Sequence, residues 1–375
     1  MRPADEAERR HLNEAFVALC AIPSPFGSER ACMEAVRREL SSLGIETEED
    51  SSAQEAGAQC GNVLARIPGR SERSVLLCAH VDTVAVADVI EPVVVDGAWR
   101  NAREAILGAD NKAAVAVVLE LARRCVRERP PVGLELLFTV AEENALAGSK
   151  AFDAGALRSA YGYVFDHASP IGEIVLASPT AYRVDAELRG VAVHAGIRPE
   201  DGRSAIVGAA VAIEGMRLGR LDPETTANVG SIHGGASTTN IVPDRCSISA
   251  EARSLDTDRA DAIVAEMVDR LHDGANAAEC DLDLEVTQTF RGYRHRRSAP
   301  QILAAEAALR TCGIEPSHIA TGGASDANAL ESTGFACTNL ANGTERNHQP
   351  DESVTVAALE QMLDVSLALL DAAAR

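Results

Sequence analysis

Short apolar runs alternate with amphipathic segments through the first half of the chain, and this alternation constrains the fold more than any other feature. Strand-like runs occur at residues 63–67, 75–79, 134–140 and 161–165. Apolar residues recur at helical spacing over residues 4–22, 28–43, 111–125 and 148–156. Parallel strands need a crossover connection, which is usually a helix, so this order predicts an α/β domain with a mostly parallel, doubly wound sheet.

The pattern changes after Pro179. Alternating strand-like segments at residues 182–188, 229–233, 246–252 and 282–289 are interrupted by helical segments at 203–218 and 256–275. This β-α-β-β-α-β order is the split βαβ, or ferredoxin-like, motif. A helix at 300–312, a short strand at 335–340 and a last helix at 354–373 then resume the first pattern. We therefore expect a main domain at 1–178 and 289–375, with an α+β domain inserted at 179–288.

Composition excludes several classes of function. The net charge of -21, without a stripe of Lys and Arg, argues against nucleic acid as a partner. No apolar run is long enough to cross a bilayer, and the charged N-terminus lacks the apolar core of a secretory signal, so no membrane partner is expected. Nine cysteines without a CxxC pair indicate reduced thiols and a cytoplasmic location.

Polar residues of the metal-binding types follow the predicted strands directly. They are His80 and Asp82, Glu142 and Glu143, Asp166, and Asp110 at the start of a helix. Because ligands bind outside the carboxyl ends of the strands in an open α/β sheet, these residues are expected at one edge. His348, in a loop before the last helix, is placed to reach the same edge.

This inventory of imidazoles and carboxylates, without thiolate, suits Zn²⁺ or another first-row divalent ion. It holds enough ligands for two ions that share one bridging carboxylate. Each residue taken alone is more simply interpreted as a solvated or core side chain. Their joint occurrence at four strand ends or helix starts favours a metal site.

The motifs resemble, in order, those of the dizinc exopeptidase superfamily that includes peptidase T, aminoacylase and glutamate carboxypeptidase. They are SVLLCAHVDTV, LGADNKAAVAVV, LLFTVAEENALAGSKAF, YVFDHASP, GVAVHAG, GGASTTNIVPDRCSISAEAR, GGASDANAL and the loop with His348. The resemblance runs from about residue 60 to 355 and is closest to the peptidase T-like branch. It implies a metal-dependent amidohydrolase that cleaves short peptides, with two Zn²⁺ ions, or Co²⁺ or Mn²⁺ in their place.

The resemblance also assigns roles at the metal centre. One ion is expected on His80, Asp110 and Asp166, and the other on Asp110, Glu143 and His348. Asp82 is expected to accept a hydrogen bond from the ring of His80. Glu142 is expected to act as the general base toward a water held between the ions.

The inserted domain is implied to mediate a homodimer and to supply substrate contacts. His194 would reach the partner's site and stabilise the oxyanion. Asn240 and Arg253 would orient the substrate, and an arginine suits a terminal carboxylate. The loop of Gly322, Gly323, Ala324 and Ser325 would line the same pocket.

Two departures from the family pattern affect substrate preference and loop geometry: Ala145 stands where a glycine is expected, and Asn111 where many relatives carry an acidic residue. Neither removes a ligand. The same residues fit an N-acyl amino acid deacylase or a carboxypeptidase, so peptides and N-acyl amino acids both stay open as substrates. A non-catalytic metal-binding or assembly protein is the alternative from another class.

Overall fold

The computed structural model describes residues 1–375, and the chain divides into two compact units. Unit 1 comprises Met1–Ala177 and His295–Arg375, and unit 2 comprises Ser178–Arg294.

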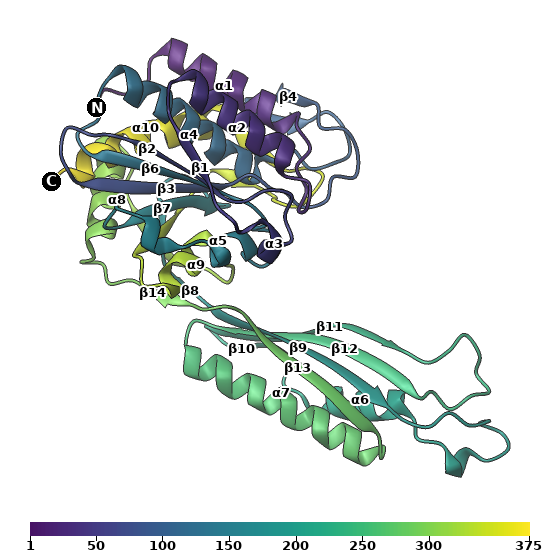
Figure 1. Ribbon diagram of the computed structural model, residues 1–375. Helices are drawn as coiled ribbons and strands as arrows, with labels where there is room; N and C mark the ends of the chain where they lie inside the picture. The colour runs from purple at the N-terminus through teal and green to yellow at the C-terminus, as the bar shows by residue number, and fades with distance from the viewer. The chain divides into compact units, whose positions relative to one another are not determined.

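The central sheet of unit 1 has its parallel strands in the middle (Figure 1). Its order is β1 (Thr47–Glu49), β2 (Val63–Ile67), β6 (Gly133–Thr139), β3 (Ser74–His80), β7 (Gly162–His167), β16 (Cys337–Ala341) and β8 (Glu173–Ser178), with β15 (Ser317–Ala320) beside β8. Pairing is parallel from β6 through β3 and β7 to β16, and antiparallel from β1 to β6. The predicted α/β sheet is therefore confirmed.

Helices cover both faces of this sheet, which explains why its middle strands are apolar throughout. Every residue of β6 is buried, as is every residue of β3 after Ser74. In Figure 1, one face carries α1 (Glu6–Cys20), α2 (Arg30–Ser42), α4 (Ala109–Arg127) and α10 (Val356–Ala373). The other carries α3 (Ala53–Ala56), α5 (Ala147–Ala151) and α9 (Asp326–Ser332), while α8 (Pro300–Thr311) packs against α10. A single 3₁₀ turn spans Ala154–Ala156.

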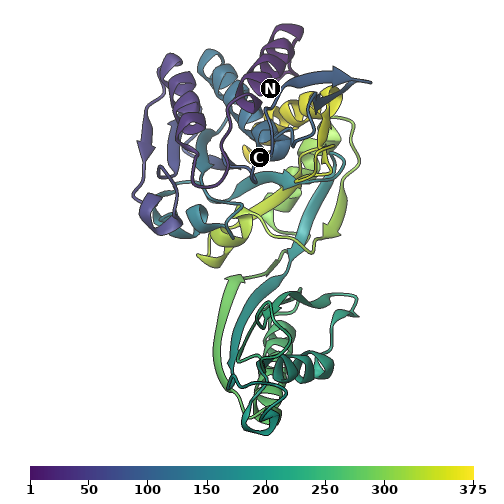
Figure 2. The same cartoon turned by 90° about the vertical axis from the view of Figure 1, so that its right-hand side faces the viewer.

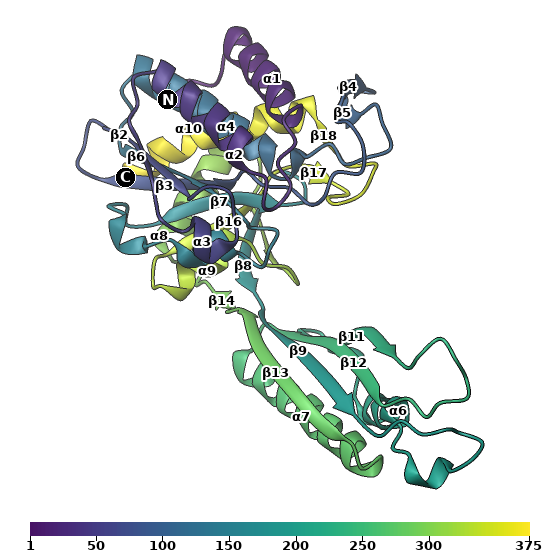
Figure 3. The ribbon, with the colours of Figure 1, turned by 45° about the vertical axis from the view of Figure 1, so that its right-hand side comes forward.

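A second, small sheet in unit 1 lies beside the loop that carries His348 (Figure 3). Its antiparallel order is β17 (Thr344–Glu345), β18 (Ser353–Thr355), β5 (Ala98–Asn101) and β4 (Pro92–Val95). The strands β17 and β18 thus anchor the two ends of the His348 loop.

Unit 2 is an antiparallel sheet with two helices on one face (Figure 2). The sheet order is β10 (Gly219–Asp222), β11 (Thr225–Gly234), β12 (Arg245–Ser254), β9 (Thr180–Arg189) and β13 (Asp281–Phe290). The helices α6 (Ala205–Gly215) and α7 (Thr257–Ala277) pack on residues such as Leu188 and Ile248. A 3₁₀ turn spans Pro199–Asp201, and the two-residue β14 (Tyr293–Arg294) ends the unit. The predicted β-α-β-β-α-β order is present, with β10 as an extra edge strand.

No helix of the chain combines the length and the apolar character that crossing a membrane requires.

Candidate metal centre

The metal-type residues of unit 1 lie at the carboxyl ends of three adjacent parallel strands. His80 is the last residue of β3, Asp166 lies near the end of β7, and Glu142 and Glu143 follow β6. Because β3 pairs with both β6 and β7, these side chains meet at one edge.

Asp110 enters from the first turn of α4, where its φ and ψ of -82° and 103° are not helical. His80 Nε2 is 3.4 Å from Asp110 Oδ1 and 3.6 Å from Asp166 Oδ1. His348 Nε2 is 3.2 Å from Asp110 Oδ2 and 2.9 Å from Glu143 Oε1. The two oxygens of Asp110 thus face the two histidines separately.

Two groups of donor atoms therefore share Asp110. One is His80, Asp110 and Asp166 and the other is Asp110, Glu143 and His348; within each group the donor atoms lie within 4.8 Å of one another. Asp110 Oδ1 and Glu143 Oε1 are buried and accept no hydrogen bond of good geometry, although histidine nitrogens lie 3.4 and 2.9 Å from them. Since a buried oxygen without a partner costs free energy, this arrangement fits bound cations. These two groups are candidate sites for two metal ions that would share Asp110.

In a third group, the donor atoms of His80, Glu142 and Glu143 also lie within 4.8 Å of one another. Glu142 Oε2 is 4.0 Å from His80 Nε2, farther than the carboxylates of Asp110 and Asp166. The division of labour between Glu142 as base and Glu143 as ligand stays a prediction.

Asp82 contacts its neighbours differently from the arrangement that the family pattern implies. The nearest acceptor to His80 Nδ1 is the backbone carbonyl of Asp82 at 2.9 Å, whereas the carboxylate oxygen Oδ1 is 3.5 Å away. A proton on Nδ1 would leave the Nε2 lone pair free for an ion. The Asp82 carboxylate instead accepts hydrogen bonds of 3.0 Å from the backbone N–H groups of both Glu142 and Glu143.

The pKa values at the site are shifted because several carboxylates are buried close together. Burial, Asp166 and Asp326 raise the pKa of Glu142 well above its usual value. Burial also raises the pKa of Asp166 well above its usual value, and the carboxylate of Asp110 adds to the effect. Asp110 is the exception, because His348 and His80 outweigh burial and lower its pKa. A bound cation would favour the ionised form of every carboxylate here.

Two buried carboxylates near the site were missed by sequence reasoning. Asp326 is fully buried at the start of α9, accepts a 2.5 Å hydrogen bond from the Thr139 hydroxyl, and has its pKa raised by burial. Glu352, 1% exposed, accepts hydrogen bonds from the backbone of the loop before Asp110, and burial raises its pKa to about 7. The only sequence signal for these two residues is their position within the family motifs. Asp326 lies in GGASDANAL, and Glu352 lies in the loop with His348.

The departures from the family pattern have visible consequences. Ala145 has a φ of 55°, in the left-handed region that favours glycine. Asn111 is fully buried, and neither polar atom of its amide has a hydrogen-bond partner.

In unit 2, His194 and Asn240 lie on adjacent segments. His194 pairs with Ile241 in an isolated bridge, and Ala195 N donates to Asn240 O at 2.9 Å. Both side chains are exposed. Arg253 does not join them, because it pairs with Ala181 at the start of β9, whereas His194 follows the end of that strand.

The guanidinium group of Arg253 already has partners within unit 2. Two of its nitrogens donate to the two carboxylate oxygens of Glu251, each at 3.0 Å, and its guanidinium lies 5.5 Å from the centroid of the Phe290 ring. Binding of a substrate carboxylate by Arg253 would compete with Glu251.

The loop before α9 belongs to unit 1. Gly323 N donates to the Thr321 hydroxyl at 3.1 Å, and Ser325 is 1% exposed at the N-cap of α9. Because Ser325 is buried, any substrate contact from this loop falls to its more open residues Gly322, Gly323 and Ala324.

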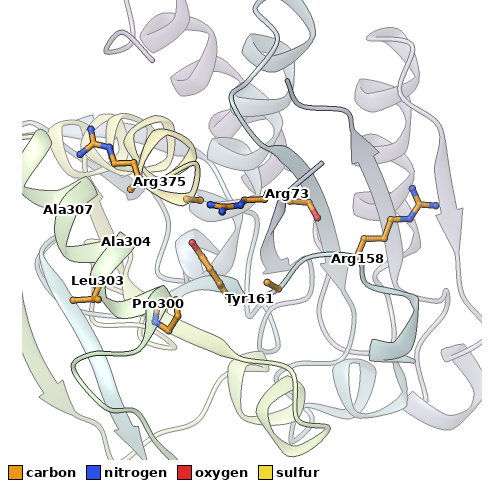
Figure 4. Close-up of a pocket in the computed structure, with 12 residues that line it drawn as sticks. Arg73, Arg158, Tyr161, Pro300, Leu303, Ala304, Ala307 and Arg375 are labelled. Carbon is orange, nitrogen blue, oxygen red and sulfur yellow. The ribbon is translucent and has the colours of Figure 1, made fainter. Parts of the chain in front are cut away.

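Figure 4 shows a surface cavity whose volume is about 670 Å³ and whose lining includes none of the metal-type residues. Ser74 and Tyr161, at the amino-terminal ends of β3 and β7, line it together with Ala304 of α8. Since the metal-type residues are at the carboxyl ends of the same strands, this cavity is not part of the candidate centre.

Comparison with known proteins agrees with the geometry. Residues 180–279 match the peptidase dimerisation domain and residues 62–169 match peptidase family M28. The chain is 34% identical to the Bacillus subtilis protein YqjE over 369 residues, covering 98% of this chain and 99% of the relative. Among solved structures, aminopeptidase PepT from Bacillus cereus is 34% identical with a TM-score of 0.90, and a tripeptidase from Staphylococcus aureus is 30% identical with a TM-score of 0.93. Each comparison covers 98% of this chain and 99% of the solved one.

Proposed function

Because the chain belongs to the peptidase T-like branch of the dizinc exopeptidase superfamily, we propose that it hydrolyses short peptides as a tripeptidase-like exopeptidase. The chain is a metallopeptidase by family. The observation that carries the proposal is the pair of donor groups sharing Asp110, with the carboxylate of Glu142 beside them.

Zn²⁺ is the metal that we propose for both positions, because two imidazoles and three carboxylates without a thiolate suit it; Co²⁺ and Mn²⁺ accept the same donors. When bound, the ions supply Lewis-acid chemistry, which polarises the scissile carbonyl and lowers the pKa of a water.

The chain's own residues then handle the proton. Glu142 takes it from the attacking water and delivers it to the nitrogen of the leaving amine. Burial and neighbouring carboxylates raise the pKa of Glu142, whereas bound cations would oppose that shift and favour the ionised form that accepts the proton. Asp82 holds the backbone of Glu142, and the imidazole of His194 from a partner subunit would donate a hydrogen bond to the oxyanion.

A homodimer through unit 2 is part of the proposal. The helix α6 is apolar over most of its length, and Ile206, Val207 and Val211 on it remain 39%, 55% and 39% exposed. Exposed apolar side chains gathered on one helix are typical of a protein–protein interface. Replacing Val207 with Glu is expected to convert the dimer to a monomer in light-scattering measurements, and a dimer that persists would contradict this interface.

We also propose a cytoplasmic location. It is supported by the nine cysteines, all of which are free thiols and seven of which are buried.

The test of the substrate class is a matched panel built on one sequence: a free tripeptide, its N-acetylated form, its C-terminal amide, a dipeptide and an N-acetyl amino acid. The proposal predicts cleavage of the free tripeptide at its first bond and loss of cleavage on N-acetylation. Cleavage of the N-acetyl amino acid, or removal of the last residue with sensitivity to C-terminal amidation, would instead identify a deacylase or a carboxypeptidase.

A further inference from the structure

We propose that Glu352 is a positioning residue that fixes the Asp110 and His348 ligands relative to one another, and thereby sets the affinity of the ion bound by Asp110, Glu143 and His348. The inference rests on the dinuclear centre of the proposed function. Glu352 itself is not a member of any of the donor groups.

Both oxygens of the Glu352 carboxylate accept hydrogen bonds from the backbone at the start of α4. Oε2 accepts hydrogen bonds from the N–H groups of Leu107 and Gly108, and Oε1 accepts one from the N–H of Asp110, all at 2.8 Å. The first N–H groups of a helix have no partner within the helix, and Gly108 at the N-cap of α4 has no side chain to supply one. A carboxylate from elsewhere in the chain therefore caps this helix, at the end where negative charge is favoured.

The same residue anchors the His348 loop. Among residues 345–352, Glu352 alone is buried, whereas the side chain of His348 is 50% exposed. Packing therefore does little to hold the imidazole, and its position depends on the backbone of the loop.

That backbone needs support. Arg346 and His348 have φ angles of 58° and 67°, in a region that residues with a Cβ adopt at a cost. Gln349 N donates to Arg346 O, Glu352 N donates to Gln349 O, and β18 begins at the next residue. The Glu352 carboxylate thus ties a strained loop that carries one ligand to the backbone N–H of another.

A buried carboxylate that accepts backbone hydrogen bonds could contribute to stability without affecting a metal ligand. Glu135 is such a carboxylate and serves as the control. It is 2% exposed, and its Oε2 accepts hydrogen bonds from the backbone N–H groups of Arg158 and Ser159 at 2.9 and 2.7 Å. Glu135 lies on β6 opposite Arg66, and neither of its backbone donors belongs to a residue of the donor groups. Its substitution perturbs a comparable clamp without touching a ligand.

The test compares Glu352→Gln with Glu135→Gln in the full chain, by Zn²⁺ content and by titration of the metal-free protein with Zn²⁺ against a competing chelator. An amide cannot accept hydrogen bonds at its nitrogen, so at least one backbone N–H loses its partner in Glu352→Gln. Glu135→Gln loses either its two backbone donors at Oε2 or the Arg66 Nε donor at Oε1. We expect Glu352→Gln to bind the second ion about 10–100-fold more weakly than wild type. The first ion, whose donor group contains Asp110 but not His348, should be weakened less. Glu135→Gln should keep two ions at wild-type affinity even if its melting temperature falls.

Two ions bound by Glu352→Gln with wild-type affinity would overturn the inference while leaving the proposed function intact. A wild-type protein that binds fewer than two ions would overturn both. Glu352→Asp, which keeps the charge but shortens the reach, is the second variant and should show the same selective weakening. If neither Glu352 variant folds in its metal-free form, Glu352 serves folding and the inference fails.

Discussion

The carboxylate of Asp82 holds the backbone of Glu142, since Asp82 Oδ1 accepts a hydrogen bond of 3.0 Å from the Glu142 N–H. Its other oxygen accepts an equivalent bond from the N–H of Glu143. Asp82, which is fully buried and lies two residues after the proposed ligand His80, therefore fixes the turn bearing the proposed base. Orientation of the His80 ring falls mainly to the backbone carbonyl of Asp82.

Replacing Asp82 with Asn tests this arrangement. The amide nitrogen cannot accept a hydrogen bond, which leaves a buried N–H without a partner at a cost of about 1–3 kcal/mol in unfolding free energy. We expect kcat to fall about 10–100-fold while two ions stay bound, because the carbonyl that orients His80 remains. Metal analysis and steady-state kinetics on the same preparation check this, and a loss of metal in step with activity would contradict it.

Ala145 predicts a stabilising substitution. A residue with a Cβ pays roughly 1–2 kcal/mol in the left-handed region, and glycine relieves most of that at a smaller entropic cost. Ala145→Gly is therefore expected to raise the unfolding free energy by about 0.5–1 kcal/mol. The control is Ala147→Gly in the first position of α5, where glycine should be destabilising by about 0.5–1 kcal/mol. Chemical denaturation gives the unfolding free energy of both variants. If both are less stable than the wild type, the prediction for Ala145 is wrong.

The role of His194 across a dimer predicts complementation. His194→Ala and Glu142→Gln are each expected to be nearly inactive with metal retained. In a mixed dimer one site would combine an intact Glu142 with an intact His194 from its partner. Random reassociation should then restore about a quarter of wild-type activity, because half of the dimers are mixed and one of their two sites is complete. No recovery on mixing, despite subunit exchange, would exclude action between subunits.

The ligand-bearing edge was predictable from sequence because each contributing residue follows its own apolar strand. His80 and Asp82 end the buried run of β3, and Glu142 and Glu143 end that of β6, so strand order alone brings them together. The hairpin of β4 and β5 was missed, although Asp96 and Gly97 between them, with φ of 51° and 78°, form the Asp-Gly turn typical of a two-residue hairpin.

Helix caps and contacts between residues far apart in the sequence were less predictable. Ser28 is of a residue type that favours N-caps, yet it does not cap α2: Ser28 N donates to Pro25 O in a turn, and Glu29 is the N-cap. Gly44, with a φ of 75°, follows the end of that helix. The contacts of Glu352 join residues 242 to 245 positions apart, a pairing that no local pattern specifies.

Comparison of Glu142→Gln with Glu143→Gln tests whether the site performs metal-dependent hydrolysis with Glu142 as the base. Metal content and tripeptide turnover are measured on each purified protein. We expect Glu142→Gln to keep two ions and lose about 10²–10⁴-fold in kcat, and Glu143→Gln to lose an ion. Wild-type turnover in Glu142→Gln, or loss of its metal, would exclude Glu142 as the base. The absence of peptide cleavage by the wild-type protein would favour a non-catalytic metal-binding or assembly role.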